Sequence, residues 1–223
     1  MSELIPAFVL HSRLYRNTSK IIEFFTAEHG RIAAVVRGVR SGRQAWRGCL
    51  QAFTPILVSF SGRYELKTLT KAEATMAPYL LQGNNLISGL YLNELLLRIL
   101  PPADPHPQLY KHYQYAIAQI NQGNSTEMVL RSFEWQTLNE LGYGLQFENI
   151  IAAEDYIFNQ EIGFSIASYK TQQRVYTGDV LLEIAKQSWQ ERKVLVAAKY
   201  LFRNALLPLL GNKPLRSREL WLK

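Results

Sequence analysis

The fold class follows from residues 7–37, AFVLHSRLYRNTSKIIEFFTAEHGRIAAVVR. Apolar and partly β-branched runs at 7–12, 19–26 and 31–37 are separated by short polar stretches, and His29-Gly30 is a turn signal. Runs of this length with turn residues between them predict consecutive short strands. The chain therefore begins with an all-β region.

Two further runs extend this pattern toward the C-terminus. Residues 53–60 are mostly apolar and are followed by Ser61-Gly62, and residues 64–72 alternate in polarity. Five strands within the first 75 residues fit the size of an OB-fold, a small barrel whose face and loops bind oligonucleotides. An SH3-like barrel gives the same periodicity, so the pattern alone leaves both open.

The character of the sequence changes to helical after Pro78. Helices are expected over about 84–100, 108–120, 124–142, 179–190 and 192–207, with irregular structure and short strands over 145–178. The proline-rich stretch 101–107 cannot continue a helix. We therefore predict an α+β chain with a five-stranded OB-fold over 1–78, which binds DNA, and a mainly α-helical domain over 79–223, which contacts partners and DNA.

Positive charge is concentrated at the two ends of the chain. The net charge is +7, and residues 1–80 hold 11 basic and 5 acidic side chains, residues 81–170 hold 4 and 9, and residues 171–223 hold 10 and 4. This distribution favours localised anion-binding surfaces, although solubility alone also accounts for a moderate positive charge.

Several classes of chemistry lack their sequence signatures. Cys49 is the single cysteine, so neither an intramolecular disulfide nor a cysteine zinc site can form. There is no phosphate-binding loop with Gly-Lys-Ser/Thr and no Gly-x-Ser-x-Gly elbow, and the four histidines lack metal-ligand spacing. We expect a protein that is not an enzyme and uses no cofactor and no metal. With no signal peptide and no apolar stretch long enough for a membrane span, we expect a cytoplasmic location.

An arginine-rich segment spans residues 31–47, from the third predicted strand into the stretch after it. It contains Arg31, Arg37, Arg40, Arg43 and Arg47, together with Trp46. Arginine forks suit phosphates, and an aromatic ring beside them can stack on any base. We predict that these six residues bind DNA. The alternative is a solvated loop with Trp46 tucked into the barrel.

A second basic region lies at the C-terminal end. Lys213 and Arg216 belong to an exposed basic segment that we also assign to DNA binding, whereas a solubilising surface is the alternative. Lys199 and Arg203 are four residues apart and share one helix face.

Several segments resemble the RecO family of bacterial DNA repair proteins. They are residues 8–11, 23–26, 30–40, 50–55, 65–69, 88–95, 130–134, 141–144 and, most specifically, 210–220. The resemblance implies DNA binding in recombinational repair, annealing of complementary strands, contact with the single-stranded DNA-binding protein SSB, and cooperation with RecR in loading RecA. It also implies association with the nucleoid. Many members carry a four-cysteine zinc site after the segment matching 141–144, and its absence here resembles the zinc-free branch.

The resemblance also implies a site for the acidic C-terminal tail of SSB. Such a tail ends in an apolar residue with a free carboxylate, so it needs an apolar pocket rimmed by cations. We expect helix 86–100 to supply apolar surface and Arg131, Lys199 and Arg203 to supply the charge. Alternatively, Arg131 only pairs with Glu127 or Glu134 on its own helix.

Two other functions remain open from the sequence. An OB-fold with an arginine-rich loop does not distinguish DNA from RNA, so the chain could be an RNA-binding protein. It could also be a structural adaptor whose basic surfaces bind acidic proteins. Single-strand versus double-strand preference and oligomeric state are not determined by these patterns.

Overall fold

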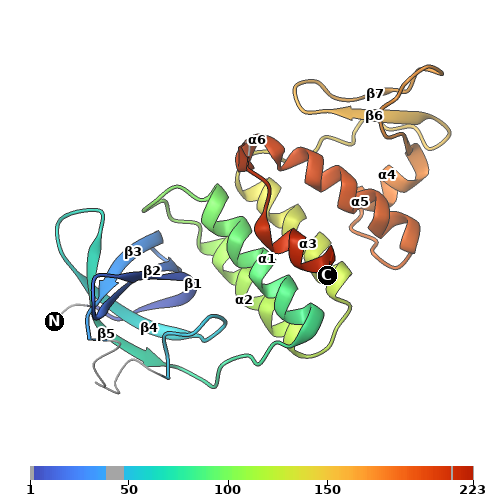
Figure 1. Cartoon of the computed structure of the whole chain (residues 1–223). Helices are drawn as coiled ribbons and strands as arrows, with labels where there is room; N and C mark the ends of the chain where they lie inside the picture. The colour runs from blue at the N-terminus through green and yellow to red at the C-terminus, as the bar shows by residue number, and fades with distance from the viewer. Residues whose placement is uncertain (1–2, 39–47, 212, 223) are drawn as a thin grey trace. The chain divides into compact units, whose positions relative to one another are not determined.

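The computed structural model describes residues 3–38, 48–211 and 213–222 (Figure 1). The chain forms two compact units. Unit 1 comprises Met1–Asn124 and Pro214–Lys223, and unit 2 comprises Ser125–Lys213. Each unit is described separately below. Among the described residues, no helix has both the length and the apolar character that crossing a membrane requires.

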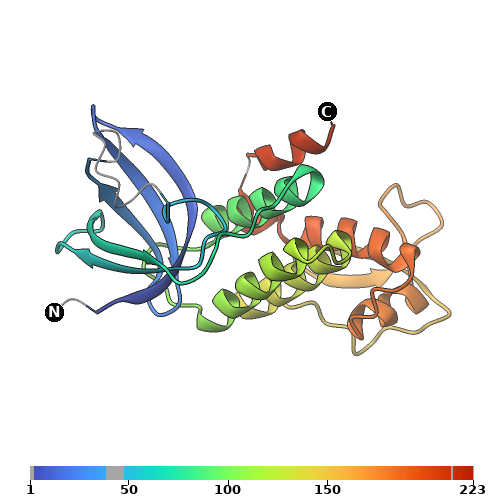
Figure 2. The ribbon, with the colours of Figure 1, turned by 90° about the horizontal axis from the view of Figure 1, so that it is seen from below.

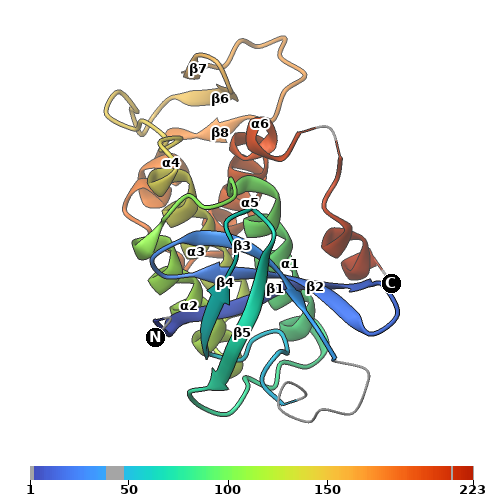
Figure 3. The same ribbon diagram turned by 90° about the vertical axis from the view of Figure 1, so that its left-hand side faces the viewer.

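Five strands of unit 1 form a closed barrel. They are β1 (Ile5–Tyr15), β2 (Ser19–Thr26), β3 (Gly30–Val36), β4 (Ile56–Ser61) and β5 (Lys67–Ala74). Their order is β1-β2-β3-β5-β4, and β4 pairs back with β1 to close the barrel. Only the β3–β5 pairing is parallel among these strands. The predicted N-terminal OB-fold is confirmed, and Figure 3 shows its five strands together.

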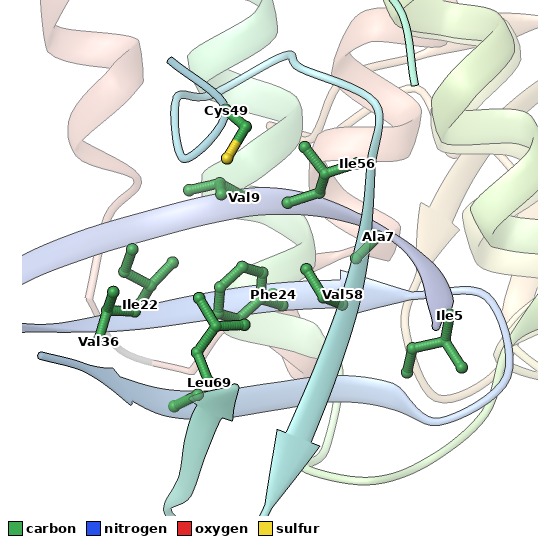
Figure 4. Packing of buried hydrophobic residues seen from close by; sticks show 11 residues of the cluster. Ile5, Ala7, Val9, Ile22, Phe24, Val36, Cys49, Ile56, Val58 and Leu69 are labelled. Carbon is green, nitrogen blue, oxygen red and sulfur yellow. The ribbon is translucent and has the colours of Figure 1, made fainter. Parts of the chain in front are cut away.

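Alternating side chains of these strands fill the barrel. Ile22 and Phe24 on β2 share one core cluster with Ala34 and Val36 on β3, and all four are nearly inaccessible to solvent. Figure 4 labels Ile22, Phe24 and Val36 in this cluster. Successive side chains of a strand point to opposite faces, so every second residue enters the core. Cys49 also lies in this core, and burial raises the pKa of its thiol.

The other face of β1 and β2 is covered by two helices of the same unit, α1 (Gly83–Ile99) and α2 (Pro107–Asn121). Phe8 and Phe25 pack against Tyr110 and Tyr113 of α2, with ring centroids 5.1–6.1 Å apart. Packing therefore groups these two helices with the barrel. The functional division between 1–78 and 79–223 stays a prediction.

Unit 2 combines helices with a small sheet. It contains α3 (Thr126–Glu140), α4 (Gly178–Ala185), α5 (Arg192–Ala205) and the short α6 (Leu207–Leu210). Strands β6 (Asp155–Asn159), β7 (Gly163–Ile166) and β8 (Tyr176–Thr177) pair in the order β7-β6-β8. Trp135 of α3 contacts Phe202 of α5, with their rings 6.0 Å apart. The helix expected over 179–190 ends at Ala185, and Gln187 has a positive φ of 55° that no helix accommodates.

Unit 1 is completed by the end of the chain. Residues Arg216–Leu222 form a 3₁₀ helix, η2, which packs on α1. Figures 1 and 2 both show η2 (red, at the C-terminus) beside α1 (green). Segments 88–95 and 210–220, which carry the family resemblance separately in the sequence, thus include two elements that contact each other.

Candidate nucleic-acid interface

A groove of about 940 Å³ lies against the barrel in unit 1. It is lined by residues of β1, β2 and β3, by the end of β4, and by the loop between β4 and β5. Its charged and aromatic lining includes Arg13, Glu23, Arg31, Arg63, Tyr64 and Lys67. OB-folds bind oligonucleotides with the β2–β3 face and with the β1–β2 and β4–β5 loops. The groove includes residues of β2, of β3 and of the β4–β5 loop, which are three of these parts.

The β1–β2 hairpin carries three cations. Its strands stay paired as far as Tyr15 and Ser19, so the hairpin extends well beyond the rest of the barrel (Figure 3). Arg13, Arg16 and Lys20 lie on it, and the Arg16 guanidinium lies 5.2 Å from the centroid of the Tyr15 ring. No acidic residue occurs between Glu3 and Glu23. The hairpin therefore presents positive charge together with an aromatic ring.

The β4–β5 loop presents a similar combination. Gly62 adopts a φ of +115°, and the Lys67 ammonium donates a 3.2 Å hydrogen bond to its carbonyl, which closes the base of the loop. Tyr64, near the tip, is 85% exposed and follows Arg63 directly. An exposed ring of this kind can stack on a base of any type. The loop therefore offers a stacking surface with a cation beside it.

Ion pairing separates the cations of the barrel into two kinds. Arg31 is mostly buried, pairs with Glu23 at 2.9 Å and donates from Nε to the Leu100 carbonyl at 3.0 Å. In contrast, seven other cations of the barrel form no ion pair among the residues that the structure describes. Two are Lys67 and Lys71 of β5, and the five outside β5 are Arg13, Arg16, Lys20, Arg37 and Arg63. These five can neutralise the phosphates of a ligand without first breaking an internal ion pair.

The structure describes two residues of the predicted arginine-rich segment, Arg31 and Arg37. Arg37 is exposed directly after β3, where its neighbour Val36 pairs with Lys20 of β2. Arg31 lines the groove in its ion-paired state. The remaining four residues of the prediction lie outside the described residues: Arg40, Arg43, Trp46 and Arg47. DNA contact by all six stays a prediction.

Sequence reasoning missed the two loops. Arg13 and Arg16 lie in the polar stretch between the first two predicted strands, Lys20 lies at the start of the second, and Arg63-Tyr64 follows a turn signal. Each loop has few charges, so neither is conspicuous alone. The available signal was the OB-fold prediction itself, because that fold uses the β1–β2 and β4–β5 loops for binding.

The other predicted site residues lie in three places. Lys213, in unit 2, and Arg216, in unit 1, are both exposed. Lys199 and Arg203 are exposed on α5. Arg131 is only 6% exposed and pairs with the buried Glu134 of its own helix at 2.8 Å, which was the alternative that the sequence left open. Contact of these residues with DNA or a partner stays a prediction.

No group of three or more histidine, cysteine, aspartate or glutamate side chains that could hold a metal ion occurs in the described ranges. The expectation that the protein uses no metal is not tested by this observation.

Comparison with known proteins covers nearly the whole chain. Two family models match, "Recombination protein O N terminal" over residues 1–77 and "Recombination protein O C terminal" over residues 80–165. The chain is 41% identical over 224 residues to a protein named "DNA repair protein RecO" from Coxiella burnetii (strain RSA 493 / Nine Mile phase I), covering 97% of this chain and 96% of that protein. It is 40% identical over 221 residues to the protein of the same name from Actinobacillus succinogenes, covering 96% and 93% respectively. It is also 40% identical over 227 residues to the one from Haemophilus influenzae (strain ATCC 51907 / DSM 11121 / KW20 / Rd), covering 99% and 96%.

Proposed function

The chain belongs to the RecO family of recombination and DNA repair proteins, and we propose that within recombinational repair it binds single-stranded DNA on its barrel and anneals complementary strands. The observation that carries the proposal is the set of five barrel cations outside β5 without ion pairs among the described residues, two of which, Arg13 and Arg63, line the groove together with the exposed ring of Tyr64. Phosphates would meet the cations, and a base would stack on the ring.

Annealing needs no chemical step under this proposal. Two strands repel each other through their phosphates, and a surface that neutralises part of this charge lets them approach and pair. We therefore expect annealing without nucleotide and without a metal ion. A requirement for ATP, or loss of annealing on addition of a chelator, would contradict this.

The proposed interface predicts a definite dependence on salt. If about four cations contact phosphates at once, the log of the affinity for a single strand falls with log salt at a slope of roughly −3. Replacing Arg63 with alanine removes one contact and makes the slope shallower by about 0.7. Lys111→Ala is the matched control, because Lys111 is exposed on α2 and does not line the groove. Fluorescence anisotropy of a labelled oligothymidine at several salt concentrations measures both slopes.

Stacking is tested separately at Tyr64. Tyr64→Ala should weaken single-strand binding by about 1–3 kcal/mol, whereas Tyr64→Phe keeps the ring and most of the affinity. Tyr169→Ala is the control, since Tyr169 is fully exposed in unit 2 and does not line the groove. Equal affinities for all four proteins would overturn this part of the interface. Competition by RNA of the same sequence at equal affinity would instead favour RNA binding.

We also propose partner contacts in repair. Lys199 and Arg203, exposed on one face of α5, are proposed to bind the acidic tail of SSB together with Arg131, and double-stranded DNA, RecR and RecA are the further proposed partners. Lys199→Ala/Arg203→Ala should weaken binding of an SSB tail peptide and leave binding of bare single strands unchanged. RecA filament formation on SSB-coated DNA, with and without RecR, tests the loading role.

A further inference from the structure

A single carboxylate on α1 holds the C-terminal end of unit 1. Oε1 of Glu94 accepts a 2.9 Å hydrogen bond from the backbone N–H of Arg216. Oε2 accepts two, from the backbone N–H of Ser217 at 2.8 Å and from the Ser217 hydroxyl at 2.6 Å. These N–H groups open η2, where no carbonyl within the helix is available to them. Glu94 therefore caps η2 from a different element.

The surroundings of this cap are built around the same residues of α1. Leu215 and Ser217 are buried, and the Arg218 guanidinium lies 5.6 Å from the centroid of the Tyr91 ring. Burial by itself raises the pKa of Glu94, but the hydrogen bonds from Ser217 and Arg216 and the nearby charge of Arg98 outweigh it and hold the pKa below its usual value. Glu94 is thus ionised at neutral pH and can accept all three bonds.

The cap lies next to one of the predicted DNA contacts. The backbone N–H of Arg216 donates to Glu94, and the Arg216 side chain is exposed. Glu94 therefore fixes the backbone from which the Arg216 side chain extends into solvent.

We propose that Glu94 is a positioning residue for DNA binding, which caps η2 and thereby holds Arg216 where it contacts a phosphate of a bound single strand. The proposal rests on the proposed DNA-binding function. It gives an acidic residue the unusual effect of strengthening the binding of a polyanion.

The direction in which Glu94→Gln changes the DNA affinity distinguishes a positioning role from a simple effect of charge. Removing a negative charge near a DNA-binding surface ordinarily strengthens binding, because the surface becomes more positive. Glu94→Gln removes the charge and replaces one of the two acceptor oxygens with an amide nitrogen that cannot accept a bond from the facing N–H, so the cap is weakened. Positioning predicts binding weaker by about 3–10-fold at moderate salt. It also predicts a salt slope shallower by up to about 0.7, the contribution of one phosphate contact.

The chain offers a matched control in the same segment. Glu219→Gln makes the same change in charge within η2, and Glu219 is exposed and does not take part in the cap. We expect its affinity to be unchanged or slightly higher. Ser217→Ala changes no charge and removes one of the three bonds, so an intermediate loss is expected.

A double-mutant cycle links Glu94 to Arg216. Arg216→Ala should show the weakened binding and shallower slope of Glu94→Gln, and adding Glu94→Gln to Arg216→Ala should weaken binding no further. The measurements use the full chain and a labelled oligothymidine over a range of salt, with thermal unfolding to confirm that each variant folds. Hydrogen exchange of residues 213–222 should be faster in Glu94→Gln.

The possible failures can be told apart. Salt-independent or absent binding by the unaltered protein would overturn the proposed function and this inference with it. Normal binding by the unaltered protein, together with equal or tighter binding by Glu94→Gln, would overturn the inference alone. A further loss of affinity when Glu94→Gln is added to Arg216→Ala would do the same. If Glu94→Gln fails to fold, Ser217→Ala decides, and unchanged affinity and slope in that variant would overturn the inference.

Discussion

The hydroxyl of Tyr113 on α2 donates a 2.6 Å hydrogen bond to Oδ1 of Asn93 on α1, in the interior of unit 1. Burial, and after it the neighbouring Tyr110, raises the pKa of Tyr113, so its hydroxyl stays protonated and available as a donor. The amide of Asn93 in turn donates to the Leu10 carbonyl at 3.1 Å, where the pairing of β1 with β2 shifts register. One polar side chain thus joins both helices to the irregular point of the barrel.

Asn93→Leu should destabilise the protein by about 2–4 kcal/mol, because the Tyr113 hydroxyl loses its acceptor and the Leu10 carbonyl loses its donor. Adding Tyr113→Phe should recover part of this loss, since no buried hydroxyl is then left unsatisfied. Denaturant unfolding of the three variants gives the coupling. Gln114→Leu, exposed on α2, is the control and should change stability little. Strictly additive losses for Asn93 and Tyr113 would contradict the network.

Gly30→Ala should be far more destabilising than Gly83→Ala. Both glycines have positive φ, 63° and 52°, so each substitution costs about 1–2 kcal/mol in the backbone. A Cβ on Gly30 would also lie 1.9 Å from the backbone oxygen of Asp104, whereas one on Gly83 meets nothing within 4 Å. Chemical unfolding of the two variants measures the difference, and equal losses would show that the contact with Asp104 is easily relaxed.

Replacing Arg31 should mainly lower the stability of the fold, whereas replacing Arg37 should mainly weaken DNA binding. Arg31→Ala should lower stability by about 1–3 kcal/mol, because Arg31 bridges Glu23 and the Leu100 carbonyl in a largely buried position. Arg37→Ala should leave stability within about 0.5 kcal/mol and reduce the salt slope of DNA binding by about 0.7. Thermal unfolding and anisotropy distinguish the two. Undiminished stability in Arg31→Ala with a reduced slope would instead make Arg31 a pure DNA contact.

Arg131→Ala should destabilise unit 2 by about 3–5 kcal/mol, since it leaves the buried carboxylate of Glu134 without its charged partner. Lys199→Ala and Arg203→Ala, both at exposed positions, should change stability little. Unfolding curves must therefore accompany any peptide-binding measurement on Arg131. Unchanged stability with lost binding of an SSB tail peptide would support a direct partner contact by Arg131.

The attachment of η2 should depend on pH through Glu94. The pKa of the Glu94 carboxyl is lower in the folded than in the unfolded protein. Such a carboxyl stabilises the folded state at every pH above its unfolded pKa of about 4.3, and this stabilisation is lost as the pH falls through the folded pKa. Hydrogen exchange of residues 215–222 should therefore be unaffected between about pH 7 and 5, after correction for the intrinsic rate, and should rise at lower pH. In Glu94→Gln, hydrogen exchange of residues 215–222 should already be faster at neutral pH. Acid-independent protection in the unaltered protein would contradict this.

The strands, most helices and the family were determined by the sequence itself. Strand alternation and helical periodicity are local properties, so runs such as 19–26 and 31–37 specify their structure without knowledge of the rest of the chain. The resemblance likewise depends only on the order of residues. Which surface residues can act together is a different kind of property.

Only the tertiary structure decided which cations are exposed and able to contact a ligand. Arg31 and Arg37 look equivalent in the sequence, but closure of the barrel and the packing of the helices give Arg31 an acceptor 69 residues away and leave Arg37 exposed. The same closure brings Arg13 and Arg63 to one groove, and Glu94 meets Ser217 across 123 residues. Periodicity records how a segment divides between core and solvent. Pairing between distant segments depends on how the folded chain returns on itself, which no local pattern encodes.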